Sequence, residues 1–393
     1  MGHRTVNDFI AELEQRLDSL REQNLLRVLR RVDSPQSPRI QIDGNPFLNF
    51  SSNDYLGLAD HPVLKEAALR AVEKYGVGSG ASRLVCGSLA PFQELEESLA
   101  GFKKTESALT FSTGYAAAIG TICALLGKDD IIILDKLVHA CIVDAARLSG
   151  AKIRVFAHND LADLEDKLAW AKSQDGSHQT LVVTESIFSM DGDAAPLREI
   201  ADLKDKFNAW LMVDEAHATG IIGESGRGLA DELGIANRVE IQMGTLGKAL
   251  GASGGYICGA RALVDFLVNR ARSFIFSTAP LPASAAAATA AIKLIQSTEG
   301  EQRRTVLREH VGHLTSPLAI PGSKTPGAII PIILGGEEKA VAASLKLREQ
   351  GIFVPAIRYP TVARGKARLR VTLSAAHSTA HVTMLVDALR TSV

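Results

Sequence analysis

The chain opens with apolar residues spaced as on one face of a helix. These positions are Phe9, Ile10, Leu13, Leu17, Leu20, Leu25, Leu26 and Leu29. Their spacing predicts one amphipathic helix that continues through residue 29. Thr5 and Asp8 have the form of a capping box at its start. Arg27, Arg30 and Arg31 would then lie in its last turns, where cations suit the negative end of the helix dipole.

From residue 89 onward the pattern alternates between helical spacing and short apolar runs. Helices are predicted over 91–102, 114–126, 137–149, 161–172 and 197–207, after an earlier one at 62–75. Strands are predicted over 108–111, 131–134, 153–156, 181–184, 211–213, 241–243 and 255–258. This alternation predicts an α/β fold, in which a mostly parallel sheet has helices on both faces. Ligands of such sheets bind at the carboxyl ends of the strands.

A second unit follows an alanine-rich helix that begins near residue 283. Its predicted strands are 329–334, 352–356 and 369–373, with helices at 339–350 and 381–389. These elements indicate a small α+β domain. We therefore expect three parts. They are an N-terminal helix and strand segment over 1–50 (with strands at 40–42 and 47–50), a large domain over 51–282, and a small C-terminal domain over 283–393.

Composition narrows the classes of function. The chain is 46% hydrophobic and 22% charged, with a formal net charge of -1, as in an ordinary soluble globular protein. Near-neutral charge argues against nucleic acid as a partner. The uncharged stretch 273–292 contains Pro280 and Pro282, so it is a poor membrane span. Four cysteines without C-x-x-C spacing argue against a metal site, and with the charged N-terminus they predict a cytoplasmic protein.

Two stretches carry the strongest chemical signal. Residues 240–255 (EIQMGTLGKALGASGG) place Lys248 in a glycine-dense turn just after a predicted strand. In a partly desolvated turn a lysine loses its proton more easily, so its amine can form a Schiff base. Residues 211–220 (LMVDEAHATG) end a buried strand in Asp214, with His217 three residues on. Pyridoxal phosphate needs this pair, because the lysine holds its aldehyde and the acid keeps its pyridine nitrogen protonated.

Other polar residues follow predicted strands at the same edge. Residues 112–115 (STGY) turn a strand into a helix whose first N–H groups form a natural phosphate cup, although an ordinary β–α turn is the alternative. His139 follows another strand, as a ring that stacks on a cofactor or as a helix-surface residue. Arg358 follows a strand of the small domain, where it binds a carboxylate through two nitrogens or remains a solvated charge.

Short motifs suggest two further classes of enzyme. Residues 214–217 spell the D-E-A-H box of helicases, but no G-x-x-x-x-G-K-[ST] precedes them, so the helicase interpretation fails. Residues 251–255 match G-x-S-x-G, with Ser253 as the nucleophile of a serine hydrolase. A nucleophile elbow follows a strand, whereas a strand is predicted after this motif. The hydrolase therefore stays a distant alternative.

The longer motifs together resemble the α-oxoamine synthase family of fold-type-I pyridoxal phosphate enzymes. The resemblance runs nearly end to end, and it implies an aminotransferase-like large domain. The segments that carry it are FLNFSSNDYLGLADHP, VFAHND, VVTESIFSMDGDAAPL, LMVDEAHATGIIGESGRG, GTLGKALGASGGY, FIFSTAPLP and AIRYPTVARGKARLRVTLSAAH.

The resemblance implies roles for single residues. Lys248 would hold the cofactor and shuttle the substrate proton, Asp214 would pair with the pyridine nitrogen, and His217 would contact the ring oxygen. His139 would stack on the ring beside the substrate. The other cofactor-binding residues would be Gly114, Tyr115, Ser189, Thr245 and, reaching the phosphate of the neighbouring subunit in a homodimer, Thr278.

The resemblance also implies the substrates. Arg358 and Asn53 would hold an amino-acid carboxylate, while Arg27 and Thr361 would bind an acyl group. The implied reaction joins L-alanine to a pimeloyl thioester of coenzyme A or a carrier protein, with loss of carbon dioxide, in biotin biosynthesis. A sibling activity that joins glycine to acetyl-CoA is the alternative.

Overall fold

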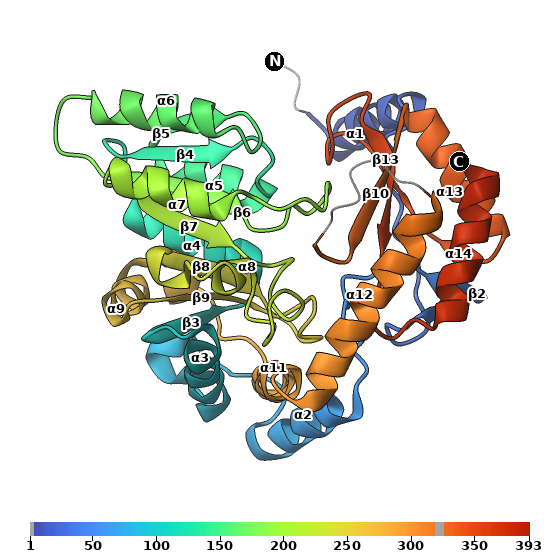
Figure 1. The fold of residues 1–393 in the computed structure, drawn as a ribbon, viewed down its shortest axis with the longest axis horizontal. Helices are drawn as coiled ribbons and strands as arrows, with labels where there is room; N and C mark the ends of the chain where they lie inside the picture. The colour runs from blue at the N-terminus through green and yellow to red at the C-terminus, as the bar shows by residue number, and fades with distance from the viewer. Residues whose placement is uncertain (1–3, 319–325) are drawn as a thin grey trace.

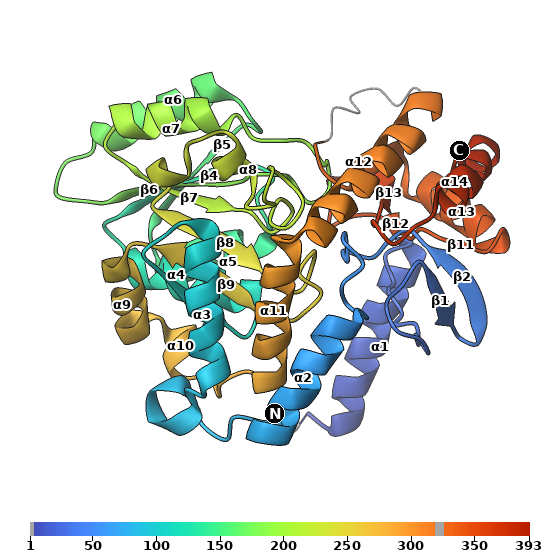
Figure 2. The same cartoon turned by 60° about the horizontal axis from the view of Figure 1, so that its bottom comes forward.

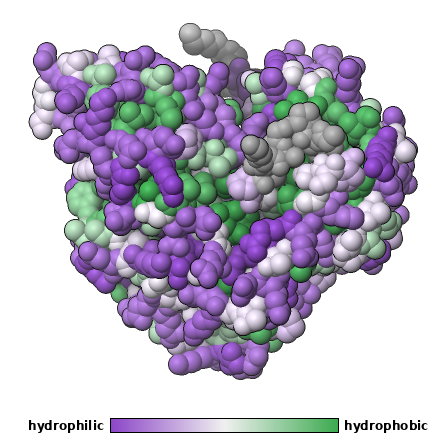
Figure 3. Space-filling model, viewed as in Figure 1, coloured by the Kyte–Doolittle hydropathy of each residue, from purple (hydrophilic) through white to green (hydrophobic). Residues whose placement is uncertain are grey.

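The computed structural model of the protein describes residues 4–318 and 326–393. Residues 1–3 and 319–325, which fall in the first and third expected parts, lie outside the described residues. Figure 1 shows two lobes, with the long sheet in one and the C-terminal strands and helices in the other. Helices α2 (Pro62–Tyr75) and α11 (Pro282–Ile295) pack side by side along one end of the molecule (Figure 2). The face seen in Figure 3 is mostly hydrophilic, with apolar residues gathered toward its centre.

The large lobe is built on a seven-stranded sheet. In spatial order its strands are β3 (Ser107–Phe111), β9 (Gly255–Gly259), β8 (Ile241–Thr245), β7 (Trp210–Asp214), β6 (Thr180–Glu185), β4 (Ile131–Asp135) and β5 (Lys152–Phe156). Only β9 runs against its neighbours, and the other strands all point the same way. The predicted α/β fold is therefore confirmed.

Both faces of this sheet are buried under helices, because alternate strand residues point to opposite sides. Ile131 and Ile133 face one apolar core, whereas Ile132 and Leu134 face the other. The first core contains α11 together with α3 (Ala90–Lys103), α6 (Leu161–Lys172), α7 (Leu197–Lys206) and α8 (Leu229–Glu232). The second contains α4 (Gly114–Leu125), α5 (Ala140–Ser149), α9 (Arg261–Arg270) and α10 (Arg272–Ile275). Burial on both sides explains why the strands read as continuous apolar runs.

The small lobe contains two three-stranded sheets. One is β1 (Arg39–Ile42), β2 (Asn45–Asn49) and β11 (Ile352–Phe353), and the other is β10 (Ile329–Gly335), β13 (Ala367–Thr372) and β12 (Ala356–Ile357). The N-terminal strands thus share a sheet with the C-terminal part of the chain. Helices α12 (Thr298–Leu318), α13 (Glu337–Glu349) and α14 (Thr379–Ser392) complete this lobe.

The predicted single strand 352–356 is wrong. Its first part pairs in parallel with β2, whereas Ala356 and Ile357 pair with β13 in the other sheet. Pro355 lies between the two pieces, and proline has no N–H with which to continue a ladder.

Helix α1 (Val6–Glu22) ends earlier than predicted. The expected capping box is present, since Thr5 and Asp8 exchange side-chain and backbone hydrogen bonds. Asn24 has a φ of 55°, a left-handed conformation that stops a right-handed helix. The expectation that Arg27, Arg30 and Arg31 lie in the last turns of the helix is therefore wrong, and they lie beyond it in a segment without regular structure. No helix of the described residues is long and apolar enough to span a membrane.

Candidate active site

Several parallel strands of the large sheet end in polar residues at the same edge. Asp135 ends β4, Glu185 ends β6, Asp214 ends β7 and Thr245 ends β8. Lys248 follows Thr245 by three residues. The carboxyl edge of the sheet thus brings Asp214 and Lys248, which the sequence singled out, together with two further acids.

Glycine shapes the turn that carries Lys248. The turn is closed by backbone bonds, with the Leu246 N–H donating to the Gly254 carbonyl and the Gly251 N–H donating to the Lys248 carbonyl, both at 2.9 Å. Gly251 has a φ of +61°, and a Cβ there would lie 2.5 Å from the carbonyl carbon of Leu58. Only glycine fits this position, so the backbone around Lys248 is held in one conformation.

A chain of hydrogen bonds runs from Lys248 into the lobe interface. Lys248 Nζ lies 2.7 Å from His217 Nε2, and His217 Nδ1 lies 2.5 Å from the hydroxyl of Tyr55. The Tyr55 hydroxyl also donates to Asn53 Oδ1 at 3.2 Å. Tyr55 is fully buried. We call Lys248, His217, Asp214 and Asn53 the inner cluster, with Asp214 included for the electrostatic reasons below.

Burial and neighbouring charges set the ionisation of the inner cluster. Burial lowers the pKa of Lys248, although the carboxylates of Asp214 and Glu185 oppose this shift. Burial raises the pKa of Asp214, and the Lys248 ammonium opposes that shift in turn. Burial, followed by the charges of Lys248 and Arg370, lowers the pKa of His217 well below its usual range. The lysine amine is therefore more easily deprotonated than on a surface, which favours nucleophilic chemistry.

The same residues fit a ring with a cationic nitrogen and an aldehyde. Asp214 is 5% exposed, and its carboxylate accepts the Ala216 N–H at 2.9 Å. Among the described residues, no lysine or arginine forms an ion pair with it. A buried carboxylate beside an amine of lowered pKa matches the requirements of pyridoxal phosphate.

The start of α4 provides the predicted helix N-terminus beside this cluster. The Thr113 hydroxyl accepts the Ala116 N–H at 3.0 Å, which caps the helix. A Cβ on Gly114 would lie 3.8 Å from that of Thr245, so the helix begins next to the end of β8. Tyr115 donates to Asp144 at 2.6 Å and is 45% exposed. Free N–H groups at such an end suit a phosphate.

Three other predicted residues lie in different settings. His139 caps α5, which therefore begins at Ala140 instead of residue 137, and Asp214 and Lys248 both act on its pKa, which burial lowers. Ser189 is buried, and its N–H donates to Glu185 Oε2 at 3.1 Å. Thr278 is exposed in the single chain and forms an isolated bridge with Ser82.

Arg27, Arg358 and Thr361 form a second group, which we call the outer cluster. Arg27 Nη2 donates to Thr361 Oγ1 at 3.2 Å, and the Thr361 N–H donates to the Arg358 carbonyl at 3.0 Å. The Arg358 guanidinium donates to the carbonyl of Asn24. No hydrogen bond among the described residues joins Arg358 to Asn53.

Arg370, like Tyr55, is a residue of this site that the sequence did not predict. It lies on β13, is 8% exposed, and donates through both terminal nitrogens to Asn53 Oδ1 at 3.2 Å. Its Nε donates to the Ser189 carbonyl at 2.6 Å. An arginine inside a predicted apolar strand was the available signal, because arginine is almost never fully buried without a partner.

The serine motif does not have the geometry of a nucleophile elbow. Strand β9 begins two residues after Ser253, whereas an elbow follows its strand. The Ser253 backbone exchanges hydrogen bonds with the hydroxyl of Ser284.

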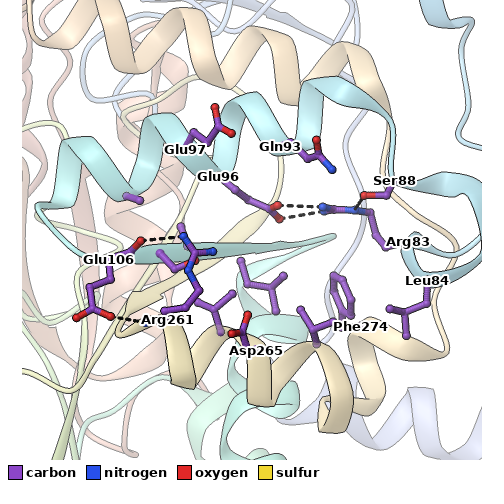
Figure 4. A pocket seen from close by; sticks show the side chains of 16 residues that line it. Arg83, Leu84, Ser88, Gln93, Glu96, Glu97, Glu106, Arg261, Asp265 and Phe274 are labelled. Carbon is purple, nitrogen blue, oxygen red and sulfur yellow. Dashed lines mark hydrogen bonds and ion pairs between the residues drawn. The ribbon is translucent and has the colours of Figure 1, made fainter.

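A separate cavity of about 560 Å³ lies beside the edge strand β3 (Figure 4). Two of its charged side chains, Arg83 and Glu96, form an ion pair. Arg83 binds both oxygens of Glu96 at 2.9 Å, and Glu106 accepts the Arg261 N–H. Glu96 also accepts the N–H of Thr110, so it covers an open backbone group of the sheet edge. This cavity contains none of the predicted site residues.

Known proteins resemble this chain over nearly its full length. The family described as aminotransferase class I and II matches residues 45–389. An 8-amino-7-oxononanoate synthase of Geotalea daltonii is 50% identical, covering 95% of this chain and 96% of that protein. One of Pelobacter propionicus is 46% identical, covering 98% and 96%.

Solved structures of pyridoxal phosphate enzymes and of an 8-amino-7-oxononanoate synthase also match this chain over most of its length. A variant of serine palmitoyltransferase from S. paucimobilis, with a bound PLP–myriocin aldimine, has a TM-score of 0.91 at 28% identity, covering 99% of this chain and 98% of that one. The 8-amino-7-oxononanoate synthase of Francisella tularensis has a TM-score of 0.75 at 29% identity, covering 88% and 97%. The chain therefore belongs to the aminotransferase class I and II family, in the branch of pyridoxal phosphate-dependent enzymes named 8-amino-7-oxononanoate synthase.

Proposed function

We propose that this protein condenses L-alanine with a pimeloyl thioester. The products are 8-amino-7-oxononanoate, carbon dioxide and the free thiol of coenzyme A or a carrier protein. A bond forms between the alanine Cα and the acyl carbonyl carbon, the carbon–sulfur bond breaks, and the alanine carboxylate leaves as carbon dioxide. The observation that carries this proposal is the inner cluster, found in a chain that is 50% identical to a protein named 8-amino-7-oxononanoate synthase.

Pyridoxal phosphate, when bound, supplies an electron sink for the charge that develops at Cα. Lys248 would hold its aldehyde, Asp214 would stabilise its cationic nitrogen, and His217 would contact its ring oxygen. His139 would stack on the ring. Ser189, Thr245, Gly114 and Tyr115 would complete the site, with Thr278 contributed to the neighbouring subunit of a homodimer.

Lys248 is the proposed base. Its amine has a lowered pKa, so it takes the Cα proton and later returns a proton to the product. His217 lies 2.7 Å from that amine and is held by the buried Tyr55, which keeps the amine directed to one position. Proton transfer depends on this placement as much as on the pKa.

We assign the alanine carboxylate to Arg370 and Asn53, in preference to Arg358. Arg370 is buried, directs two nitrogens toward Asn53 and forms no ion pair with any described carboxylate. A buried guanidinium in this state suits a substrate anion. Arg358 is committed to the Asn24 carbonyl and lies with Arg27 and Thr361.

The outer cluster then receives the acyl substrate. Two arginines and a hydroxyl, drawn from the N-terminal segment and the small lobe, suit the distal carboxylate of a pimeloyl group.

Cysteines that all lack a disulfide partner in the described residues support a cytoplasmic setting.

Thiol release by the cofactor-loaded protein tests the proposal. Alanine or glycine is combined with pimeloyl-CoA or acetyl-CoA, and release is expected chiefly with alanine and pimeloyl-CoA. Release chiefly with glycine and acetyl-CoA would overturn the substrates and keep the Lys248 chemistry. Release without any amino acid would indicate a hydrolase, and the Ser253→Ala variant would then lose it.

A further inference from the structure

The turn over residues 188–194, between β6 and α7, lies where the two lobes meet. The Phe188 N–H donates to the Asp193 carbonyl at 3.0 Å, and the Gly192 N–H donates back to the Phe188 carbonyl at 2.8 Å. Ile187 and Ala194 form an antiparallel bridge at its base. We call this compact unit the clasp turn.

The small lobe holds one side of the clasp turn through two arginines of β13. Arg370 Nε donates to the Ser189 carbonyl at 2.6 Å. Arg368 Nη1 donates to the Met190 carbonyl at 3.0 Å and to Asp191 Oδ1 at 2.7 Å. The two arginines are two residues apart, so they project from the same face of the strand. Arg368 is 4% exposed, which protects its ion pair from solvent.

The large lobe holds the other side through His158 and Asn159. His158 Nε2 donates to Asp193 Oδ2 at 2.8 Å, and its Nδ1 donates to Asp135 Oδ1 at 3.0 Å. Asn159 Nδ2 donates to the same Asp193 oxygen at 3.0 Å and to the Ala194 carbonyl at 3.2 Å. An imidazole that donates from both nitrogens is an imidazolium. The clasp turn is thus tied to the carboxyl edge of the sheet, where Asp135 ends β4.

One of these ties, at Ser189, holds the Arg370 guanidinium, which Thr372 also binds through Nη1 at 3.0 Å. Arg370 donates from Nε to the Ser189 carbonyl. Because the guanidinium is planar, its two terminal nitrogens then point to Asn53. A shift of Ser189 would rotate the whole fork. Glu185 binds the Ser189 N–H, and Arg368 binds the two residues that follow Ser189, Met190 and Asp191.

We propose that Asp191 and Arg368 are positioning residues for amino-acid binding: their ion pair holds the clasp turn so that Arg370 faces the carboxylate of the substrate. The inference rests on the proposed role of Arg370 as the carboxylate clamp. Asp193 and His158 support the clasp turn from the large lobe. None of these four residues belongs to the inner cluster.

The test measures the affinity of the cofactor-loaded enzyme for L-alanine, by the change in cofactor absorbance and without any thioester. Asp191→Asn and Arg368→Gln are expected to weaken alanine binding about tenfold, a smaller effect than the roughly hundredfold loss of rate that a misplacement of about 1 Å can cause. In steady-state assays the KM for alanine should rise similarly, while the KM for the thioester stays within about twofold. Wild-type affinity in both variants would overturn the inference.

A double variant shows whether the effect passes through Arg370. If it does, Asp191→Asn should weaken alanine binding in the wild type but add almost nothing in an Arg370→Lys background. Effects that multiply in the double variant would overturn the positioning role. Asp205→Asn, which breaks an ion pair with Arg238 elsewhere in the large lobe, is the matched control and should leave alanine affinity unchanged.

Failure of the proposed function has a different signature. If wild-type enzyme responds to glycine or serine and not to alanine, the assigned substrate is wrong. The same variants are then titrated with the responding amino acid. The positioning role holds if they bind it about tenfold more weakly, and falls if they do not.

Discussion

The inner and outer clusters are built in different ways. In the inner cluster, Asp214, His217 and Lys248 lie at or just after the ends of parallel strands, Asp214 is buried, and backbone hydrogen bonds close the Lys248 turn. The outer cluster joins Arg27, from a segment without regular structure, to Thr361 across most of the chain, and both residues are exposed. In the low-dielectric interior a charge acts strongly on its neighbours, whereas at the surface water and salt screen it. We therefore expect the chemistry and the binding of alanine at the inner cluster, and selection of the acyl substrate at the outer one.

The largest effect is expected when the proposed base of the inner cluster, Lys248, is removed. Lys248→Ala should lower the turnover number by about 10³-fold or more, because it removes both the amine that holds the cofactor and the proton carrier. Thiol release measures the loss, and the absorbance of the bound cofactor should change with it. Lys366→Ala, an exposed lysine near the outer cluster, serves as control and should retain activity. An active Lys248→Ala enzyme would contradict the assignment of the base.

The next prediction separates the two arginines. Arg370→Ala should raise the KM for alanine by about 30-fold, in line with the roughly 2 kcal/mol of a hydrogen bond to a charged group. Arg358→Ala should leave that KM within about twofold and raise the KM for the thioester instead. Steady-state kinetics with each substrate varied in turn measures both. The reverse pattern would place the carboxylate clamp in the outer cluster.

A smaller effect is expected at Arg27. Because it is exposed, its pairing with an acyl carboxylate should contribute at most about 1 kcal/mol. Arg27→Ala should therefore raise the KM for pimeloyl-CoA about threefold at low salt. The difference should shrink as salt is added, while alanine binding stays constant. An equal loss for acetyl-CoA would show that Arg27 contacts the carrier and not the distal carboxylate.

The smallest effect concerns stability at the clasp turn. Burial by itself would lower the pKa of His158, but its hydrogen bonds to Asp135 and Asp193 outweigh burial and raise that pKa to about 10. A histidine whose pKa is raised on folding stabilises the protein fully below its unfolded pKa, near 6.5, and loses that contribution as pH rises toward about 10.

Thermal unfolding across this window measures the contribution. The Tm of the wild type should be about 2 °C higher than that of His158→Asn near pH 6, and this difference in Tm should disappear toward pH 10. His178→Asn, at a histidine that forms no ion pair with the described residues, is the control and should show no such pH dependence. A gap that widens with pH would contradict the imidazolium assignment.

The inner cluster could be predicted because its signals are local. Apolar runs that end in Asp214 or Thr245 mark strand ends, and the carboxyl ends of parallel strands meet at one edge. The glycines around Lys248 predict a turn, and this prediction does not require the residues that contact the turn in the folded protein. The resemblance of long motifs then connected these residues to a family.

Other features depended on contacts between distant segments. Helical spacing continued past Glu22, yet the left-handed conformation of Asn24 ended the helix, which placed Arg27 beside Thr361. The split of residues 352–357 between two sheets follows from pairing with β2, some 300 residues away. Periodicity carries no information about such partners.

The sequence by itself determined the α/β fold, and it predicted the edge that carries the chemistry, with Lys248, His217 and Asp214 as its central residues. Only the tertiary structure showed that Arg370, not Arg358, meets Asn53, and that Arg370 also donates to the Ser189 carbonyl in the clasp turn. The physical reason is that the residues next to a strand end are enough to specify it. The partner of a buried guanidinium is decided by which distant segments fold against it.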